Sequence, residues 1–337
     1  MKQKRTAVPL SSPANTHQSV SPYVIGADIG GSNLRLALAN GSGEILGRWN
    51  GSTAGLVDAT MVLRLMRKGV DALLCEAALS PGSLSAIAAG APGITNVDRG
   101  VVIATSYLMG WRDVPLREML EAEFGVPASV DNDVNLAAIG ELHAGSAQGV
   151  SDFVFLAIGT GIGAGIMLKG EVHRGSHWTA GELGYMLVPG TSVAPVGRGN
   201  PGALEAIAGG EGIKAHWKSR WCMDLTTLPK DATASEIFDH AREHNALAQE
   251  VLELVARALA YAIYNTSLVL NSPLFVLGGS VGIHPALGDA TRQVLAELGA
   301  RVQPTLMRSA LGADAQLIGA IFMALRTASR KPVLAAS

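Results

Sequence analysis

Three glycine-rich strings are the first residues in this chain whose types could do chemistry. Each follows a short apolar run that is typical of a β-strand. Glycine lets backbone N–H groups come close to phosphate oxygens, so such a string can bind a polyphosphate. One string alone is weak evidence, because many hairpins turn on glycine. Three at strand ends favour phosphate binding, by Gly30, Gly31, Ser32 and Asn33, by Thr160 and Gly161, and by Gly278 and Gly279.

The residues around these strings exclude two common nucleotide motifs. None of the strings continues into Gly-Lys-Ser or Gly-Lys-Thr, as a Walker A loop does. The first two lead into a predicted hairpin, whereas a dinucleotide-binding fingerprint opens a helix. Asp28 ends the strand before the first string, where a carboxylate can hold Mg²⁺ directly or through water. The alternative for Asp28 is a turn-capping role.

A polar cluster, Asn132-Asp133-Val134-Asn135, lies at a predicted junction between a strand and a helix. Phosphoryl transfer needs positioning, charge stabilisation and one group that accepts the proton of the attacking hydroxyl. Asp133 is the candidate for that base, and Asn132 is a candidate hydrogen-bond partner for a sugar hydroxyl. A helix N-cap is the alternative for either residue, and their spacing does not separate the two interpretations.

Two glutamates stand among small or apolar residues, which is unusual for a solvated surface. Glu182 lies in Ala-Gly-Glu-Leu-Gly-Tyr, and Glu205 in Gly-Ala-Leu-Glu. Carboxylates are strong acceptors for pairs of sugar hydroxyls, so both are candidate substrate contacts. A surface role is the alternative for either glutamate taken alone.

An internal repeat organises the elements that must position these groups. When Ile29-Gly30 is placed over Ile158-Gly159, the predicted second strands coincide and hairpin residue Gly41 falls on Gly170. Two copies of this unit, each followed by helices, predict two similar α/β lobes that face a cleft. We expect a disordered tail at 1–22, an N-terminal lobe at 23–131 plus 313–337, and a C-terminal lobe at 132–312. The final helix is predicted at 311–325, opened by Gly312.

Composition narrows the class of protein. The 337 residues suffice for two lobes with a buried core, and 48% of them are hydrophobic. The formal net charge is −2 with no basic stripe, so we expect no nucleic-acid partner. Two widely spaced cysteines fit a reducing compartment. No signal-peptide pattern or bilayer-spanning stretch is evident, so we expect a cytoplasmic protein that does not bind membranes.

In these motifs the chain resembles the ROK sugar kinases of the actin-like ATPase superfamily, from about Tyr23 to Arg326. The resemblance implies a two-lobed, ribonuclease H-like fold, ATP and Mg²⁺ as cofactors, a small sugar as partner, and a homodimer. The matching segments, in order, begin at Ile25, Gly90, Gly110, Asn132, Gly159, Gly181, Val276 and Leu317.

The resemblance also assigns roles to residues. Asp133 matches the catalytic base, and Asp28 the carboxylate near Mg²⁺. Sugar contacts match Asn132, Glu182 and Glu205, and Gly93 lies in a loop that lines the same site. The family's positions around the nucleotide correspond in this chain to Gly30, Gly31, Ser32, Asn33, Thr160, Gly161, Gly278 and Gly279.

The chain departs from the family pattern near the sugar. Tyr185 stands where the family has a histidine that contacts the sugar and ligates zinc, and the segment 195–205 has no cysteine. A structural zinc site needs about four thiolate or imidazole ligands, so we expect no zinc. Tyr107 stands where the family often has asparagine. Glucose is therefore expected on family frequency alone.

Other functions remain open. One alternative is a catalytically weak sugar-binding or sensing protein, and another is a kinase for a different hexose or an N-acetylhexosamine. A DNA-binding repressor is disfavoured, because only about 22 polar residues precede the first predicted strand. A filament-forming or chaperone-like ATPase would leave Glu182 and Glu205 without a role.

Overall fold

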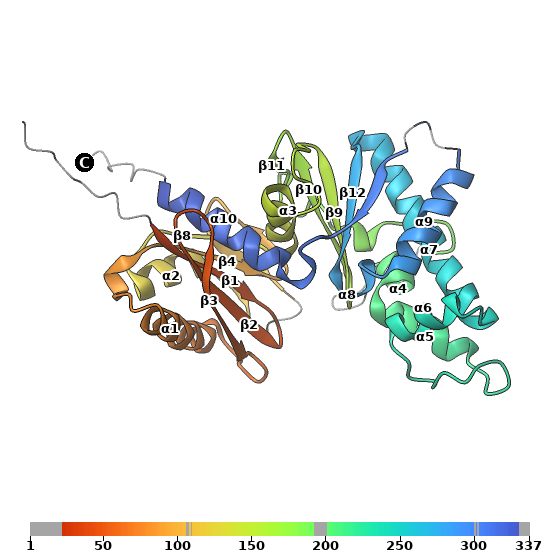
Figure 1. Ribbon diagram of the computed structural model, residues 1–337, viewed down its shortest axis with the longest axis horizontal. Coiled ribbons are helices and arrows are strands. Elements are labelled where there is room, and N and C mark those ends of the chain that lie inside the picture. The colour runs from red at the N-terminus through yellow and green to blue at the C-terminus, as the bar shows by residue number, and fades with distance from the viewer. Residues whose placement is uncertain are drawn as a thin grey trace, which may run out of the picture.

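The computed structural model describes residues 22–105, 108, 110–191, 201–299, 301 and 303–329. Two five-stranded mixed sheets lie side by side along the long axis of the molecule (Figure 1). The first has the order β3-β2-β1-β4-β8, formed by β1 (Tyr23–Ile29), β2 (Asn33–Ala39), β3 (Ile45–Ser52), β4 (Leu84–Ala91) and β8 (Ala128–Asn132). The second has the order β11-β10-β9-β12-β13, formed by β9 (Phe153–Ile158), β10 (Ile162–Leu168), β11 (Glu171–Val172), β12 (Leu274–Gly278) and β13 (Thr305–Arg308).

The repeat predicted from the sequence is confirmed by these sheets. Strands β2 and β10 begin and end at equivalent positions of the alignment that places Gly30 on Gly159. Strands β1 and β2 pair antiparallel, and so do β9 and β10. Strand β4 runs parallel to β1 in the first sheet, and β12 runs parallel to β9 in the second. The carboxyl ends of the parallel strands therefore meet at one edge of each sheet, which is where ligands commonly bind in α/β folds.

The outer face of the first sheet is covered by two helices and a small additional sheet. Helices α1 (Ala59–Glu76) and α2 (Leu116–Phe124) share one apolar cluster with the strands, including Ile25, Met66 and Leu120. Asp58 caps α1, its side chain accepting the N–H of Met61. The small sheet joins the same cluster through Val102, and consists of β5 (Ile94–Asn96), β6 (Val101–Ala104) and β7 (Arg112–Val114).

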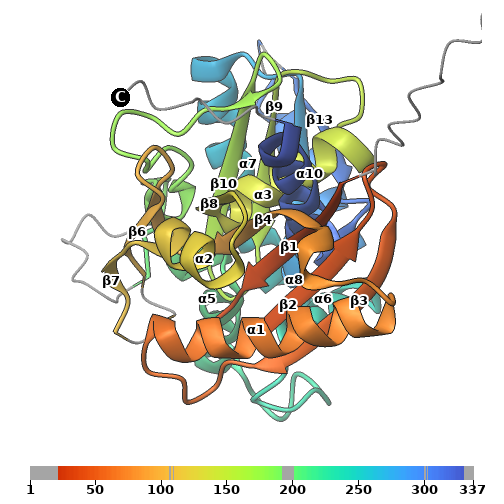
Figure 2. The same ribbon diagram turned by 90° about the vertical axis from the view of Figure 1, so that its left-hand side faces the viewer.

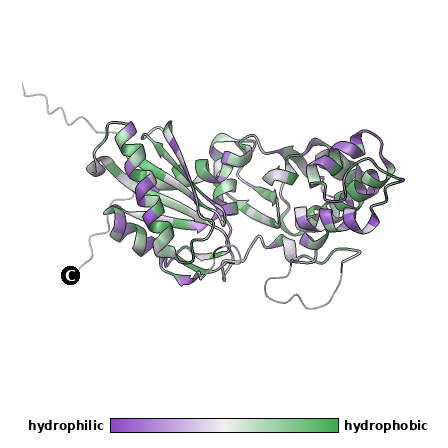
Figure 3. Ribbon diagram, turned by 90° about the horizontal axis from the view of Figure 1, so that it is seen from below, coloured by the Kyte–Doolittle hydropathy of each residue, from purple (hydrophilic) through white to green (hydrophobic). Residues whose placement is uncertain are grey.

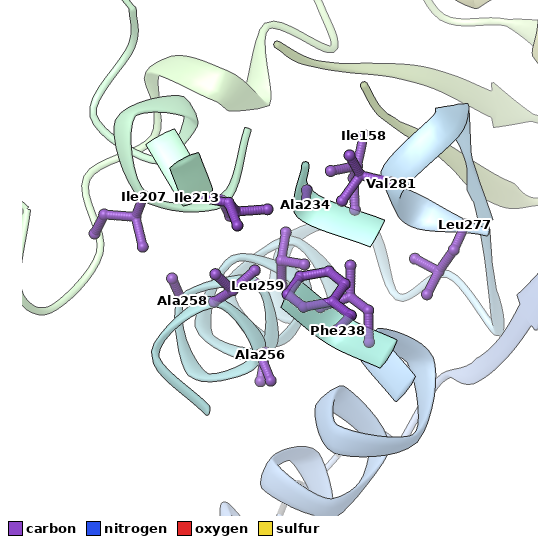
Figure 4. Close-up of a cluster of buried hydrophobic side chains, with 14 of the residues drawn as sticks. Ile158, Ile207, Ile213, Ala234, Phe238, Ala256, Ala258, Leu259, Leu277 and Val281 are labelled. Carbon is purple, nitrogen blue, oxygen red and sulfur yellow. The ribbon is translucent and has the colours of Figure 1, made fainter. Parts of the chain in front are cut away.

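The outer face of the second sheet is covered by a larger group of helices around α7 (Ala246–Leu270). Figure 4 shows Phe238 and Leu259 packed among the aliphatic side chains of this cluster. In Figure 3 apolar residues follow the strands, and polar residues gather on the outward surfaces of the helices. The other helices of this group are α4 (Glu205–Ala208), α5 (Gly210–Arg220), α6 (Ala234–Arg242), α8 (Gly279–Gly282) and α9 (Pro285–Glu297).

Two helices lie between the two sheets (Figure 1) and cross each other (Figure 2). Helix α3 (Asp133–Ala144) continues from β8 of the first sheet and packs on β9 and β10 of the second. Helix α10 (Ala315–Ser329) follows β13 and returns to pack on β1 and β4. Gly140 and Gly319 lie at the crossing, where a Cβ on Gly319 would be 1.8 Å from the carbonyl oxygen of Leu136. The two backbones are therefore in direct contact.

A buried carboxylate ties the end of α3 to the segment that leads into α10. The side chain of Glu141 accepts hydrogen bonds from the Ser309 hydroxyl, from the N–H of Leu311 (3.4 Å) and from the N–H of Ser146 (2.7 Å). Glu141 is fully buried. Because a buried charge is stable only when it is hydrogen-bonded, these donors fix the conformation of the connection.

The start of the final helix differs from the prediction. Gly312 has φ +55°, a left-handed conformation that an α-helix does not contain. A 3₁₀ turn therefore occupies Gly312–Asp314, and α10 begins at Ala315. Within the described part of the chain, no helix combines the length and the apolar character needed to cross a bilayer. The predicted disordered tail, apart from Pro22, lies outside the described residues, and the lobe boundaries remain a prediction.

Candidate active site

Asp28 lies at the end of β1 and is almost fully buried, with 8% of its surface exposed. Arg35 faces it across the β1–β2 hairpin and donates two hydrogen bonds to its Oδ2 atom, from Nε at 2.8 Å and from Nη2 at 2.6 Å. Burial raises the pKa of Asp28, and the guanidinium of Arg35 opposes that shift. Arg35 also donates to the carbonyl oxygen of Ala313, so it links this carboxylate to the segment before α10.

The first two glycine strings form tight turns with exposed outer surfaces. In the first, the N–H of Gly30 donates to the carbonyl oxygen of Asn33, and Thr53 donates its hydroxyl to the carbonyl oxygen of Gly30. In the second string the N–H of Gly159 donates to the carbonyl oxygen of Gly161 at 2.9 Å, which is one residue closer along the chain. The side chains of Ser32, Asn33 and Thr160 and the backbone of Gly31 are exposed, as residues that contact a ligand must be.

The third string requires glycine for packing as well. A Cβ on Gly278 would be 2.2 Å from the ring of Phe155, and one on Gly279 would be 2.3 Å from the carbonyl oxygen of Ile158. Gly279 also has φ +78°. These contacts place the third string against the end of β9, directly before the second string. The two strings therefore lie next to each other at the edge of the second sheet.

Asp133 is the first residue of α3, at the carboxyl end of β8. Strand β4 separates β8 from β1, and its residue Gly90 lies in register with Asp28. A Cβ on Gly90 would be 2.7 Å from the side chain of Leu136 and 3.5 Å from the Cα of Asp133, so the first turn of α3 packs closely on β4 at this glycine. Burial above all, together with the charges of Asp28 and Glu182, raises the pKa of Asp133 to about 7, against a hydrogen bond from the N–H of Val134. Asp133 is thus poised to exchange a proton near neutral pH.

Asn132 is the N-cap of α3, which was the alternative to a sugar contact. Its Oδ1 atom accepts the N–H groups of Val134 (2.8 Å) and Asn135 (3.2 Å). Its Nδ2 atom donates to the carbonyl oxygen of Gly93 at 2.9 Å, and the second N–H of that amide has no acceptor among the described residues. Gly93 has φ +97°, and a Cβ there would be 2.2 Å from the carbonyl oxygen of Ala104. The structure thus brings Asn132 and Gly93 together.

A small cavity of about 40 Å³ lies where these residues meet the second sheet. Ligand pockets commonly measure about 300–1,000 Å³, so this cavity by itself is too small to enclose a hexose. Loss of hydration raises the pKa of Glu182, and the charge of Glu205 raises it further. Glu205 accepts the N–H of Ile162 at 2.8 Å, which holds it at the start of β10. The cavity is lined by Gly93, Asn132, Val134, Asn135, Gly163, Ala164, Trp178, Ala180, Gly181 and Glu182.

Three polar residues of the site were missed by the sequence analysis. Arg35 could have been found from hairpin register, because it lies opposite Asp28. Asp131 precedes the polar cluster and is fully buried. Arg174 forms an ion pair with Asp131 from 43 positions away, and no local signal identifies it.

The segment in which the family has its zinc ligands, around Tyr185 and residues 195–205, is only partly described. Tyr185 ends a 3₁₀ turn at Leu183–Tyr185, and 56% of its surface is exposed. Partial burial raises its pKa, and so do the charges of Glu182 and Glu205. Tyr107 and residues 192–200 lie outside the described residues. The structure shows no group of three or more His, Cys, Asp and Glu residues that could hold a metal ion among the residues it does describe. The absence of zinc stays a prediction.

The comparisons with known proteins match almost the whole chain. The model of the ROK family matches residues 24–327. The glucokinase of Halalkalibacterium halodurans is 32% identical over 77% of this chain and 80% of its own length. A beta-glucoside kinase of Listeria monocytogenes is 29% identical over 90% and 97%. The xylose repressor of Caldicellulosiruptor bescii is 27% identical over 76% and 65%.

A solved structure shares both the fold and the family. It is a ROK family glucokinase from Streptomyces griseus in complex with glucose and AMPPNP. It is 25% identical, with a TM-score of 0.72 over 90% of this chain and 99% of that one. The expected fold class, an α/β actin-like ATPase fold, is confirmed by this structural match and by the two repeated sheets. By its family match and its relatives, the chain belongs to the ROK family.

Proposed function

We propose that this protein is an ATP-dependent hexose kinase, with glucose as the expected substrate and glucose 6-phosphate as the product. The observation that carries the proposal is the position of Asp133. Its carboxylate stands at the end of the first sheet, close enough to Asp28 and Glu182 for their charges to add to the effect of burial and raise its pKa to about 7. A base with that pKa can take a proton from a hydroxyl at neutral pH.

In the proposed reaction, Asp133 accepts the proton of the sugar hydroxyl while the hydroxyl oxygen attacks the γ-phosphorus of ATP. The bond from that phosphorus to the bridging oxygen breaks, and ADP leaves. Gly93, Asn132, Glu182 and Glu205 are proposed to hold the sugar hydroxyls. The remaining N–H of Asn132 and the carboxylate of Glu182 are the groups that support this, because both line the cavity.

The glycine strings are proposed to bind the nucleotide. Gly31, Ser32, Asn33 and Thr160 are exposed in the first two turns, and Gly279 packs against Ile158, which directly precedes the second turn. Asp28 fits the usual Mg²⁺ donor set, which is one or two carboxylates with water and phosphate oxygens. When bound there, Mg²⁺ would neutralise charge on the phosphates. Arg35 donates both of its hydrogen bonds with Asp28 to the Oδ2 atom, so we propose that Oδ1 is the atom that would contact Mg²⁺, directly or through water.

Further proposals concern the setting of the enzyme. We infer that it acts in the cytoplasm as a homodimer, and that it binds neither nucleic acid nor membranes. The net charge of −2 supports the absence of a nucleic-acid partner. A catalytically weak sugar sensor is the second candidate, favoured by the relationship to a xylose repressor and by Tyr185 in place of the family histidine.

A sugar screen tests the proposed function directly. ADP release would be measured in a coupled assay with ATP and Mg²⁺ over glucose, mannose, allose, fructose, glucosamine, N-acetylglucosamine and N-acetylmannosamine. We expect glucose to give the highest kcat/KM, and the reaction without sugar sets the background. If a different sugar gives the highest value, glucose is the wrong substrate. If none raises ADP release above background, the hexose kinase proposal is wrong and the sugar-sensor alternative is favoured.

The pH dependence of the reaction follows from the raised pKa of Asp133. The carboxylate is a base only when deprotonated, so kcat/KM for the sugar at saturating ATP should rise with pH through about 7 and level off above it. The measurement is a pH–rate profile from about pH 5 to about pH 9, which brackets that pKa. A profile that stays flat across the acid half of this range would contradict the assignment of Asp133 as the base.

A further inference from the structure

Asp131 is a buried carboxylate for which the proposed reaction has no use. It lies near the end of β8, two residues before Asp133, and only 1% of its side chain is exposed. Its Oδ1 atom accepts the N–H of Asn132 at 2.8 Å and the side-chain amide of Asn135 at 3.0 Å. Its Oδ2 atom accepts Nε of Arg174 at 3.1 Å and also Nη2 of the same side chain. Both oxygens are therefore fully used.

Arg174 comes from the second sheet. It follows β11, and its Nη1 atom donates to the carbonyl oxygen of Val172 at 3.2 Å. The backbone carbonyl of Arg174 accepts the N–H of Ala180, which lines the cavity. The ion pair thus joins the last strand of the first sheet to a loop of the second sheet, at the point where α3 passes between them.

The hydrogen bonds of Asp131 enclose the first turn of α3. Asn132 caps the helix through its Oδ1 atom, and its backbone N–H donates to Asp131. The side-chain amide of Asn135 donates to the same carboxylate. Asp133 stands between these two residues. A carboxylate can accept four donors at once, whereas asparagine at position 131 would offer one oxygen and bring two N–H groups of its own. The charge of Arg174 stabilises that buried carboxylate.

We propose that Asp131 and Arg174 are a positioning pair, which fixes the first turn of α3 and thereby the orientation of Asp133 toward the reacting hydroxyl. This role rests on the proposed kinase function. Misplacement of a reacting group by about 1 Å can lower a rate about 100-fold. The pair acts through Asp133 and touches neither substrate.

The test compares Arg174→Met, Arg174→Lys and the double variant Asp131→Asn with Arg174→Met. The double variant removes the buried charge that Arg174→Met leaves unpaired, so it remains foldable if the single variant is not. Arg326→Met is the matched control. Arg326 also reaches β11, where it pairs with Glu171, but both side chains are exposed and neither touches the first turn of α3.

Two measurements are made on each variant. One is hydrogen exchange of peptides covering residues 131–136 in the protein without ligands. The other is kcat and KM with ATP and glucose, or with the sugar that the screen identifies.

For Arg174→Met we expect exchange at least about tenfold faster and kcat about 10–100-fold lower, with the sugar KM changed less than about fivefold. Arg174→Lys should lie between the wild type and Arg174→Met in both measurements. The double variant should have a kcat no lower than that of Arg174→Met, because the two residues act as one unit. Arg326→Met should match the wild type in both measurements.

The proposal is overturned if exchange of Arg174→Met stays within about twofold of the wild type, if its kcat is unchanged despite faster exchange, or if the kcat of the double variant falls about tenfold or more below that of Arg174→Met. If the wild-type protein shows no kinase activity, the proposed function is wrong, and the proposed link between the ion pair and catalysis is wrong with it. Hydrogen exchange then still shows whether the pair fixes the turn, so the two failures are distinguishable.

Discussion

Replacing Asp133 with asparagine is expected to lower kcat by about 10²–10⁴-fold while sugar affinity stays near that of the wild type. Asparagine has the shape of aspartate, and its Oδ1 can still accept the N–H of Val134 as Asp133 does at 2.9 Å. It cannot take the proton of the sugar hydroxyl. The measurements are coupled-assay kinetics and calorimetric titration with glucose.

Asp289→Asn is the matched control for this substitution. Asp289 lies on α9 and is exposed, where it pairs with Arg292, so its loss should leave kcat unchanged. Turnover of Asp133→Asn within about tenfold of the wild type would show that another group, or water, accepts the proton.

The same substitution should also raise stability, and this separates loss of chemistry from loss of fold. The pKa of Asp133 is about 7 in the folded protein, against 3.8 for an unperturbed aspartate. Between these values the unfolded chain loses a proton that the folded chain keeps, so the free energy of unfolding falls as pH rises from about 4 to about 7. Asp133→Asn should therefore have a higher Tm than the wild type at about pH 8, and a similar Tm at about pH 4. A lower Tm on the alkaline side would contradict the raised pKa.

Replacing Gly319 with alanine is expected to destabilise the protein by about 3 kcal/mol, which corresponds to a fall in Tm of about 6–12 °C for a large domain. The new Cβ would be 1.8 Å from the carbonyl oxygen of Leu136 and 3.0 Å from the backbone nitrogen of Gly140. Both obstacles are backbone atoms of α3, so no side chain can move aside. The crossing of α3 and α10 would have to open.

Gly288→Ala provides the control, because Gly288 is also a buried glycine inside a helix. A Cβ there would find its nearest atoms at 3.8 Å, which is ordinary contact. Alanine is favoured over glycine in a helix by about 0.5–1 kcal/mol, so this variant should match or exceed the wild-type Tm. Thermal and urea unfolding measure both variants. A Tm of Gly319→Ala within about 2 °C of the wild type would show that the two helices can separate with little loss of stability.

Much of the architecture is determined by local patterns in the sequence. The apolar runs and glycine turns predict β1, β2, β9 and β10, and their alignment predicts the repeat that the two sheets show. The edge strand β13, at Thr305–Arg308, was not predicted. It is four residues long and only Leu306 is buried, so it has too little alternation to be recognised. Its position depends on pairing with β12, which is a tertiary contact.

The candidate site divides in the same way. Asp28, Asn132 and Asp133 are recognisable because they lie beside glycine turns or a helix start, and those are local features of the chain. Arg174 reaches Asp131 across 43 positions, and Glu141 meets Ser309 across 168. Whether Asn132 caps a helix, and how far burial and Asp28 raise the pKa of Asp133, depends on groups that only folding brings together. Electrostatic and packing interactions act through space, so the sequence alone identified the candidate groups, and the tertiary structure decided their partners and the shift in the pKa of Asp133.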